Sequence, residues 1–219
     1  MEPTPLSLII ENMSIDAPKR RLRAPARRAL ITDAALEEFA AHGYDDASMG
    51  RIARAAGVTR SVLYDHFPSK RALFAALLDA KQTMLMDHLR DARVEEASME
   101  ERMGATFDAF FAFAESEPLA WRLLHPERAP VDPGAAGDQR RCRREANRLL
   151  AAMLAPDARR AGLDPQSPVG QAVFALEQSA LHGAVRWWHA HPDVPREQLT
   201  TAAMNTLWTG LGGLEQRHR

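Results

Sequence analysis

The strongest constraint on the fold is a run of helix-ending and helix-starting residues at very short intervals. Glycine is common just after a helix and proline stops one, whereas Ser or Thr caps the start of the next. The residues of this kind are Gly43, Ser48, Gly57, Thr59, Pro68 and Ser69. They predict a helix from Ala26, short helices over residues 49–56 and 60–67, and a long helix over residues 69–89. Four helices with such short connections predict a compact unit.

The rest of the chain is also expected to be helical, because it has no alternating strand pattern and no tandem repeat. The expected helices cover residues 103–117, 118–124, 139–155, 171–189 and 197–214. Residues 125–137 hold three prolines and two glycines, which predicts a loop. The fold class is therefore all-α, with roughly nine helices.

Composition excludes several classes of protein. Lys plus Arg (28) nearly balance Asp plus Glu (29), so any affinity for nucleic acid must come from a local patch. Cys142 is the only cysteine, which excludes a disulfide framework or a cysteine-based zinc site within one chain. No stretch approaches the ~20 apolar residues of a membrane helix, and residues 6–10 are too short for a signal peptide. We expect a soluble, cytoplasmic protein without cofactor or metal.

Residues 48–67 have the pattern of a helix-turn-helix. On a helical wheel of residues 60–67, one face carries Val62, Leu63 and Phe67, with His66 near its centre. The opposite face carries Arg60, Ser61, Tyr64 and Asp65. The preceding helix offers a matching inner face of Ile52, Ala53 and Ala56, and Gly57 permits an unusual turn. In such motifs the second helix enters the major groove of DNA.

The outer face of this second helix has the chemistry for DNA. Arg60 is near the helix start, where a guanidinium can bind both O6 and N7 of a guanine. Ser61 can contact a base or a phosphate, and Thr59 adds a hydroxyl beside free N–H groups. Tyr64 and Lys70 are placed to hold phosphates, which fix register rather than sequence. Further candidate DNA contacts are Ser48 and, in a basic arm before the first helix, Arg20, Arg21 and Arg23.

At these residues the sequence resembles the TetR family of transcriptional regulators. The matching strings are Ala34-Ala35-Leu36-Glu37-Glu38-Phe39 with His42-Gly43-Tyr44, Ile52-Ala53-Arg54-Ala55-Ala56-Gly57-Val58, and Leu63-Tyr64-Asp65-His66-Phe67-Pro68-Ser69-Lys70-Arg71-Ala72-Leu73-Phe74. The resemblance implies that Tyr64, His66 and Lys70 contact phosphates and that Arg60 and Ser61 face bases. It also implies a dimer formed by the last two helices. Gly50 departs from the pattern, because relatives often have a longer polar residue there.

This resemblance implies a division of the chain into three parts. Residues 1–25 are expected to be a flexible tail with the basic arm, residues 26–86 a DNA-binding domain, and residues 87–219 a ligand-binding and dimerisation domain. The candidate ligand-pocket residues are Phe107, Phe110, Phe111, Trp121, Met103, Met153, Phe174, Glu177 and His182. Ordinary core packing is the competing interpretation for most of them.

The helix over residues 171–189 carries two apolar stripes, and two stripes need two partners. The candidate dimer interface consists of Leu176, Ala180, Ala184, Trp187, Leu207 and Leu211. A second basic cluster surrounds Cys142, consisting of Arg140, Arg141, Arg143, Arg144 and Arg148. A solvated helix face is the favoured interpretation of this cluster. The arginines would favour a thiolate at Cys142.

The sequence therefore predicts a DNA-binding regulator rather than an enzyme. We expect a repressor that binds an inverted-repeat operator as a homodimer and is released by a small hydrophobic effector. One alternative is an all-α enzyme acting on an apolar molecule, although no catalytic residues can be assigned because no nucleophile–base pair or phosphate loop is found. The other is an architectural DNA-binding protein without an effector.

Overall fold

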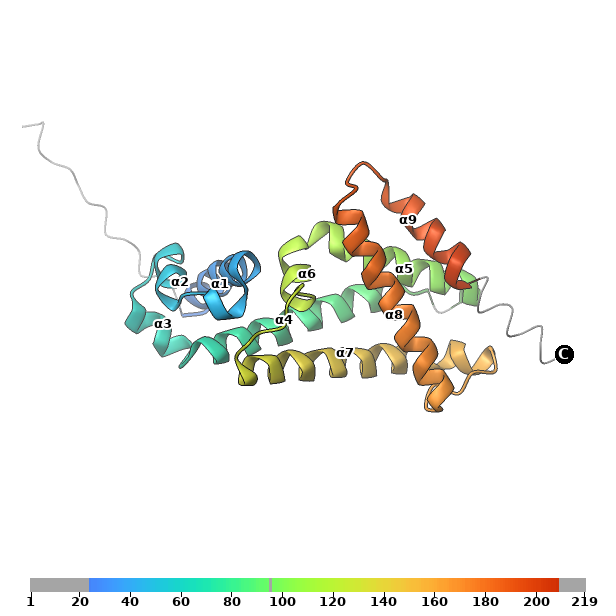
Figure 1. Cartoon of the computed structure of the whole chain (residues 1–219), viewed down its shortest axis with the longest axis horizontal. Coiled ribbons are helices and arrows are strands. Elements are labelled where there is room, and N and C mark those ends of the chain that lie inside the picture. The colour runs from blue at the N-terminus through green and yellow to red at the C-terminus, as the bar shows by residue number, and fades with distance from the viewer. Residues whose placement is uncertain (1–23, 95, 209–219) are drawn as a thin grey trace, which may run out of the picture.

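Three short-linked helices at one end and a larger helical body at the other make up the protein (Figure 1). The computed structural model describes residues 24–94 and 96–208, and this part contains helices but no strand. In chain order the helices are α1 (Ala24–Asp46), α2 (Met49–Ala55), α3 (Arg60–His66), α4 (Lys70–Asp91), α5 (Met99–Ser116), α6 (Pro118–Leu124), α7 (Pro133–Arg160), α8 (Pro168–His189), α9 (Arg196–Ala203) and the π-helical turn η1 (Met204–Trp208). The all-α prediction is confirmed.

Local capping chemistry sets the starts of α2, α3 and α4. The hydroxyl of Ser48 accepts a hydrogen bond from Gly50 N at 3.2 Å, and Thr59 accepts one from Val62 N at 3.3 Å. Ser69 accepts one from Ala72 N at 3.0 Å. Each bond satisfies an N–H group that has no partner within its helix. All three predicted caps are therefore confirmed.

The N-terminal unit packs around a small core from α1 to α4. Ile31, Ile52 and Leu63 are fully buried there. The rings of Phe39 and Phe74 meet edge to face, with 5.2 Å between their centroids. This core holds α3 against α2, and one face of α3 is left open to solvent.

Helices α4 and α7 lie side by side and run in the same direction (Figure 1). Near their starts, Arg71 Nε lies 2.7 Å from Asp138 Oδ2. Near their ends, Arg93, which follows α4, lies 2.6 Å from Asp157. The pair is thus held at both ends by charge-assisted hydrogen bonds.

Asp157 is a buried junction of three helical segments. Besides Arg93, its carboxylate binds Arg102 of α5 and, at 3.4 Å, Arg160 of α7. Burial alone would raise the pKa of Asp157, but the hydrogen bonds from Arg102 and Arg93 outweigh it and hold the pKa below its ordinary value. The carboxylate therefore stays charged and ties α7 to α5 and the end of α4.

A second connection joins the N-terminal unit to the body. Asp45, at the end of α1, accepts hydrogen bonds from Val131 N at 2.7 Å and Asp132 N at 3.1 Å, just before α7. Helix α6 also packs against α1. The small unit is therefore fastened to the body through α4, α6 and the segment before α7.

The last helices cover α5. Arg196 at the start of α9 lies 3.0 Å from Asp108 and 2.7 Å from Glu115, both on α5. The indole of Trp188 donates to Val194 O at 2.7 Å, which closes the turn between α8 and α9. Helix α9 is therefore held against α5 as well as against the end of α8.

Several predicted boundaries are wrong. Helix α1 begins at Ala24, two residues before the expected start. The expected loop over residues 125–137 is shorter, because Asp132 caps α7 through Ala135 N at 2.7 Å. Helix α7 also continues through Pro156 to Arg160, instead of ending at residue 155. The last expected helix, over residues 197–214, begins at Arg196 and changes to a π-helical turn at Met204.

Replacing Asp157 should reveal the strength of this junction. Asp157→Asn leaves the nearly buried Arg93 and Arg102 without their counter-charge, so it should lower the free energy of unfolding by about 3 kcal/mol. Urea denaturation measures this change. Because the pKa of Asp157 is lowered, the advantage of the wild type should be complete above about pH 4 and shrink at lower pH.

The matched control is Asp87→Asn, which removes an exposed carboxylate paired with Arg90 on the same turn of α4. This variant should lose less than ~0.5 kcal/mol. Equal losses in the two variants would contradict the role assigned to Asp157.

Candidate nucleic-acid interface and ligand cavity

The turn between α2 and α3 has the geometry of a helix-turn-helix. Val58 N donates to Ala53 O at 2.9 Å and Gly57 N donates to Arg54 O at 3.1 Å, the two bonds of a Schellman motif. Gly57 has a φ of 66°, as the sequence predicted. The motif ends α2 sharply and directs the chain into α3.

The faces of α3 follow the predicted wheel. Leu63 is fully buried and Phe67 nearly so, whereas Arg60, Ser61 and Tyr64 are exposed. His66 is half-buried, and its carbonyl accepts from Arg28 Nη1 at 3.4 Å. The guanidinium of Arg28 also lies 4.2 Å from the centre of the Phe67 ring. The exposed face of α3 is thus presented on a firmly anchored helix.

Gly50 makes room for the side chain of Arg60. A Cβ atom built on Gly50 would lie 2.4 Å from Arg60 Nη2 and 3.1 Å from Arg60 Cζ. No real side chain could share that space without displacing the guanidinium. The departure from the family pattern at Gly50 therefore leaves room for this position of the Arg60 guanidinium.

A buried carboxylate, which sequence reasoning missed, orders the start of α2. Glu38 Oε1 accepts from Ser48 N at 2.8 Å and from Arg51 Nε at 2.7 Å. Burial would raise the pKa of Glu38, but the hydrogen bonds from Arg51 and Ser48 hold it below its ordinary value. Its place on the inner face of α1, four residues after Ala34, could have indicated this role.

Lys70 does not point freely to solvent as the predicted phosphate contact requires. Its ammonium donates to Tyr44 O at 2.8 Å, Asp45 O at 3.0 Å and Ala47 O at 3.1 Å. An ammonium has three donors, and these three carbonyls engage all of them. A phosphate contact from this side chain would require it to leave the end of α1.

The other predicted DNA contacts differ in whether their side chains are already engaged, exposed or outside the described residues. Ser48 and Thr59 are engaged as helix caps, with their hydroxyls at the starts of α2 and α3. Arg20, Arg21 and Arg23 lie outside the described residues. Arg60, Ser61 and Tyr64 are therefore the predicted contacts that the structure leaves most open.

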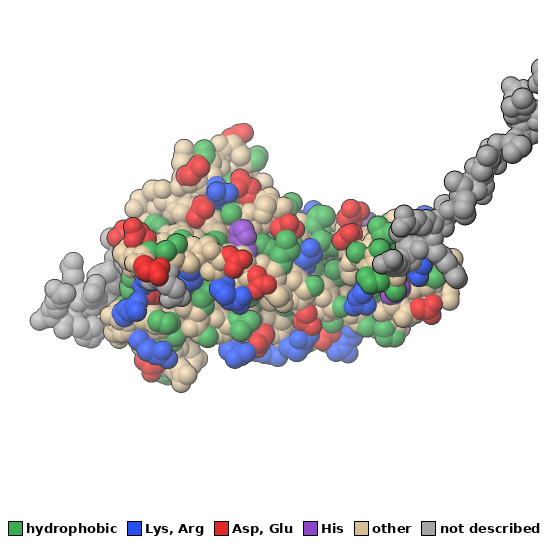
Figure 2. Space-filling model, turned by 180° about the vertical axis from the view of Figure 1, so that it is seen from behind, with side chains coloured by type: hydrophobic (Ala, Val, Ile, Leu, Met, Phe, Trp, Pro, Cys, Tyr) green, Lys and Arg blue, Asp and Glu red, His purple; other side chains and the backbone are tan. Residues whose placement is uncertain are grey.

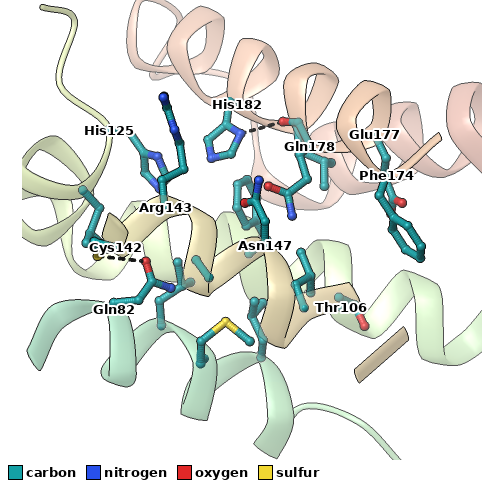
Figure 3. Close-up of a pocket in the computed structure, with 18 of the residues that line it drawn as sticks. Gln82, Thr106, His125, Cys142, Arg143, Asn147, Phe174, Glu177, Gln178 and His182 are labelled. Carbon is teal, nitrogen blue, oxygen red and sulfur yellow. Dashed lines mark hydrogen bonds between the residues drawn. The ribbon is translucent and has the colours of Figure 1, made fainter. Parts of the chain in front are cut away.

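A narrow cavity of about 50 Å³, with space for the centres of a few water molecules, lies between α4, α5, α7 and α8 (Figure 3). The predicted pocket residues that line it are Phe107, Phe110, Phe174, Glu177 and His182. The other predicted pocket residues, Phe111, Trp121, Met103 and Met153, are not among the lining residues.

Those four pack elsewhere for identifiable reasons. Phe111 is fully buried against Trp188, with 6.3 Å between ring centroids. Trp121 lies behind the cavity wall, against Phe110. Met153 lines a separate cleft beside Asp157, and Met103 is buried in the core.

Two histidines face each other at one end of the cavity. The ring centroids of His125 and His182 are 4.3 Å apart (Figure 3). Burial lowers the pKa of His125 well below its ordinary value and also lowers the pKa of His182. Both rings are therefore neutral at pH 7. The polar residues Gln82, Gln139 and His125 were missed by the sequence analysis, although Gln82 interrupts an apolar stripe between Leu78 and Leu85.

Cys142 corrects another prediction. Its thiol is buried, 3.7 Å from Leu78 O and 3.8 Å from Gln82 Oε1. Burial raises the pKa of this thiol to about 11, so the predicted thiolate is wrong. Arg141 and Arg143 are exposed, and although Arg141 acts to lower the pKa of the thiol, burial outweighs it.

The basic residues of α7 follow the lower edge of the molecule, where acidic side chains are interspersed with them (Figure 2). Arg141 lies 3.3 Å from Asp79, and Arg148 lies 2.6 Å from Glu145. This mixture of charges favours a solvated helix face.

Helix α8 leaves an apolar stripe uncovered. Leu176 is 70% exposed and Trp187 is 49% exposed, whereas Leu181 and Val185 on the other stripe are buried. Ala180 is also exposed, but the predicted interface residues Ala184 and Leu207 are half-buried. Leu211 lies outside the described residues.

The described residues also bear on metal binding and on membrane crossing. Within residues 24–94 and 96–208, no group of three or more His, Cys, Asp or Glu side chains is arranged to hold a metal ion. In the same part of the chain, no helix is long and apolar enough to cross a membrane.

The anchored α3 and the helical body define a helix-turn-helix protein with a separate cavity-bearing domain. Residues 31–77 match the family model described as bacterial regulatory proteins, tetR family. The transcriptional activator FasR of Mycolicibacterium smegmatis is 27% identical over 191 residues, which are 87% of this chain and 85% of FasR.

Solved structures agree in fold. A putative transcriptional regulator from Pseudomonas aeruginosa PAO1 has a TM-score of 0.73 and 22% identity, covering 91% of this chain and 97% of its own. The regulator FadR from Bacillus subtilis, in complex with stearoyl-CoA, has a TM-score of 0.69 and 17% identity, covering 82% and 96%. Together these matches support a helix-turn-helix transcriptional regulator of the tetR type.

Glu177 generates a prediction about pH. It is nearly buried beside the cavity, and burial raises its pKa to about 7. The folded state thus holds a proton that the unfolded state releases above about pH 4.5, so stability falls as pH rises from there to about 7. Glu177→Gln removes this loss. It should raise the melting temperature relative to wild type more at pH 8 than at pH 5. The corresponding difference in the free energy of unfolding is on the order of 2 kcal/mol.

Differential scanning fluorimetry at the two pH values measures the effect. Glu37→Gln, at an exposed glutamate of α1, is the control and should shift both melting temperatures little. A Glu177→Gln gain that is the same at pH 5 and pH 8 would argue against a raised pKa.

Proposed function

We propose that this regulator binds an inverted-repeat operator as a homodimer and that a small molecule in the cavity controls the binding. The observation that carries the proposal is the exposed face of α3, with Arg60 at the helix start over Gly50. A guanidinium held at this position suits the acceptor pair of a guanine in the major groove.

Helix α4 connects the cavity to the helix-turn-helix, and this connection supports control by a ligand. Helix α4 begins at Lys70, directly after α3, and carries cavity-lining residues from Leu78 to Leu89. A ligand that prefers a different position of α4 changes the separation of the two recognition helices in the dimer. Half-sites must lie about one helical turn apart or a multiple of it, so a misfit weakens contacts in both.

The relatives support the proposal in part. FadR from Bacillus subtilis, which shares this fold, was solved in complex with stearoyl-CoA, and this supports a small-molecule ligand for the present chain. FasR is named an activator, whereas the sequence analysis predicted a repressor. Repression by this chain, with release by its effector, stays a prediction.

Arg60→Ala should relax operator specificity. The operator is first selected from random duplexes with the wild-type protein, and affinities are then measured by fluorescence anisotropy on single-base variants. Loss of a bidentate contact should cost ~1–3 kcal/mol per half-site and flatten the preference at one base pair. Arg159→Ala, at an exposed arginine near the end of α7, is the matched control and should keep the wild-type preference. An unchanged base preference in Arg60→Ala would remove Arg60 from the readout.

Charges on the exposed stripe of α8 should break the dimer. The double variant Leu176→Glu and Trp187→Glu places two carboxylates where we expect a second copy to pack. Sedimentation should give a dimer for wild type and a monomer for the variant, with operator affinity reduced at least ~10-fold because a single half-site remains. The control Val131→Glu alters an exposed residue far from α8 and should stay dimeric. A wild-type chain that sediments as a monomer would defeat the dimer.

A further inference from the structure

Four buried polar atoms lack a hydrogen-bond partner among the described residues, and all four belong to residues that line the cavity. They are Gln82 Nε2, His125 Nε2, Gln139 Oε1 and His182 Nε2. Buried polar atoms in folded proteins are almost always hydrogen-bonded, because desolvation without a partner is costly. Their convergence from α4, α7, α8 and the residue after α6 indicates a built recognition site.

The hydrogen-bonding role of His182 follows from its other ring nitrogen. His182 Nδ1 lies 2.6 Å from Gln178 O, and a carbonyl oxygen only accepts (Figure 3). Nδ1 therefore carries the proton. The buried ring is neutral, so Nε2 presents a lone pair and accepts.

For each of the two glutamines, the amide atom that already has a partner shows which amide atom faces the cavity unpaired. Gln139 Nε2 donates to Leu123 O at 3.2 Å, which leaves Oε1 as an acceptor. Gln82 Oε1 lies 3.8 Å from the Cys142 thiol, which leaves Nε2 as a donor. The site thus offers two acceptors and one donor, in addition to His125.

The rest of the cavity is mainly apolar. Its walls beyond the polar end include Leu85, Leu89, Phe107, Leu150 and Leu154. The polar end lies nearer to the helix-turn-helix, because Gln139 is next to Asp138, which binds Arg71 at the start of α4. The cavity therefore has its unpartnered polar atoms toward the DNA-binding unit and a mainly apolar lining, interrupted by Thr106, Asn147 and Glu177, away from it.

Building on the proposed function, we propose that the effector is an amphipathic molecule with an uncharged polar end that both donates and accepts hydrogen bonds. A primary amide, an alcohol or a phenol fits this description. A carboxylate does not, because it only accepts and would face the lone pairs of Gln139 Oε1 and His182 Nε2. Burying that charge with Gln82 Nε2 as its one assigned donor would add a further penalty.

Arg143 offers the competing recognition mode. It also lines the cavity, but its side chain is exposed. An anionic effector would be recognised there rather than by the four unpartnered atoms. The test therefore includes anionic probes and an Arg143 variant.

Binding of two matched probe series to the full chain, without DNA, tests the proposal. The first is octanamide, 1-octanol and octanoate, and the second is 4-butylbenzamide, 4-butylphenol and 4-butylbenzoate. Calorimetry and thermal shift at pH 7.5 should show that an uncharged member binds at least tenfold more tightly than the carboxylate of its series. The proposal is overturned if neither series shows this order, or if a carboxylate binds best and loses affinity in Arg143→Ala.

Variants at the polar end give a second readout. His182→Phe removes an acceptor and keeps an aromatic ring, so the best uncharged probe should bind at least tenfold more weakly. The melting temperature without probe should change little, because the substitution removes the buried unpartnered Nε2 together with the hydrogen bond from Nδ1 to Gln178 O. Gln139→Met should weaken binding in the same direction, and Gln198→Met, on the exposed surface of α9, is the control. Unchanged binding in both cavity variants would also overturn the proposal.

The outcome is separable from that of the proposed function. An anionic molecule that binds the cavity and releases the operator would overturn only the ligand class. Failure to select any operator would contradict the proposed regulatory function. The probe series would still test the ligand class, because it is measured without DNA.

Discussion

The parallel pairing of α4 with α7 is the constraint on which the rest of the structure depends. One helix begins where the recognition helix ends, passes along the cavity and finishes at the Asp157 junction. Ion pairs at both ends, Arg71 with Asp138 and Arg93 with Asp157, prevent α4 from sliding along α7. Because packed interiors are stiff, a displacement of one helix of this pair would be passed to the other through these contacts.

The cavity shows how a binding site is maintained at some cost to stability. Its polar end keeps Gln82, Gln139 and two histidines incompletely bonded, and Glu177 nearby is buried without a cationic partner in the described part of the chain. An interior selected for stability alone would have apolar side chains at these positions. The same region buries Cys142, whose thiol serves packing and a weak hydrogen bond rather than redox chemistry.

Sequence reasoning succeeded where the determinants are local and failed where they are tertiary. Thr59 and Gly57 act on atoms a few residues away, so their roles as cap and turn could be predicted. The helix expected over residues 139–155 continues through Pro156, and the neighbouring Asp157 anchors α7 to residues more than fifty positions away. The prediction for Cys142 was wrong because burial raises the pKa of the thiol more than the exposed Arg141 lowers it. The cavity was only partly predicted, because bulky aromatic residues are found throughout the core and not only around a cavity. Polar residues that interrupt an apolar stripe were the better indicators of the cavity lining.

The space above Gly50 has a consequence for redesigning the proposed readout of DNA by α3. Because the absent side chain of Gly50 and the guanidinium of Arg60 occupy one volume, the two positions are not independent. A shorter residue at position 60 would leave a gap over α2, and a longer residue at position 50 would redirect the arginine. Libraries that vary the recognition helix alone would therefore sample only part of the accessible specificities, and positions 50 and 60 need to be randomised together.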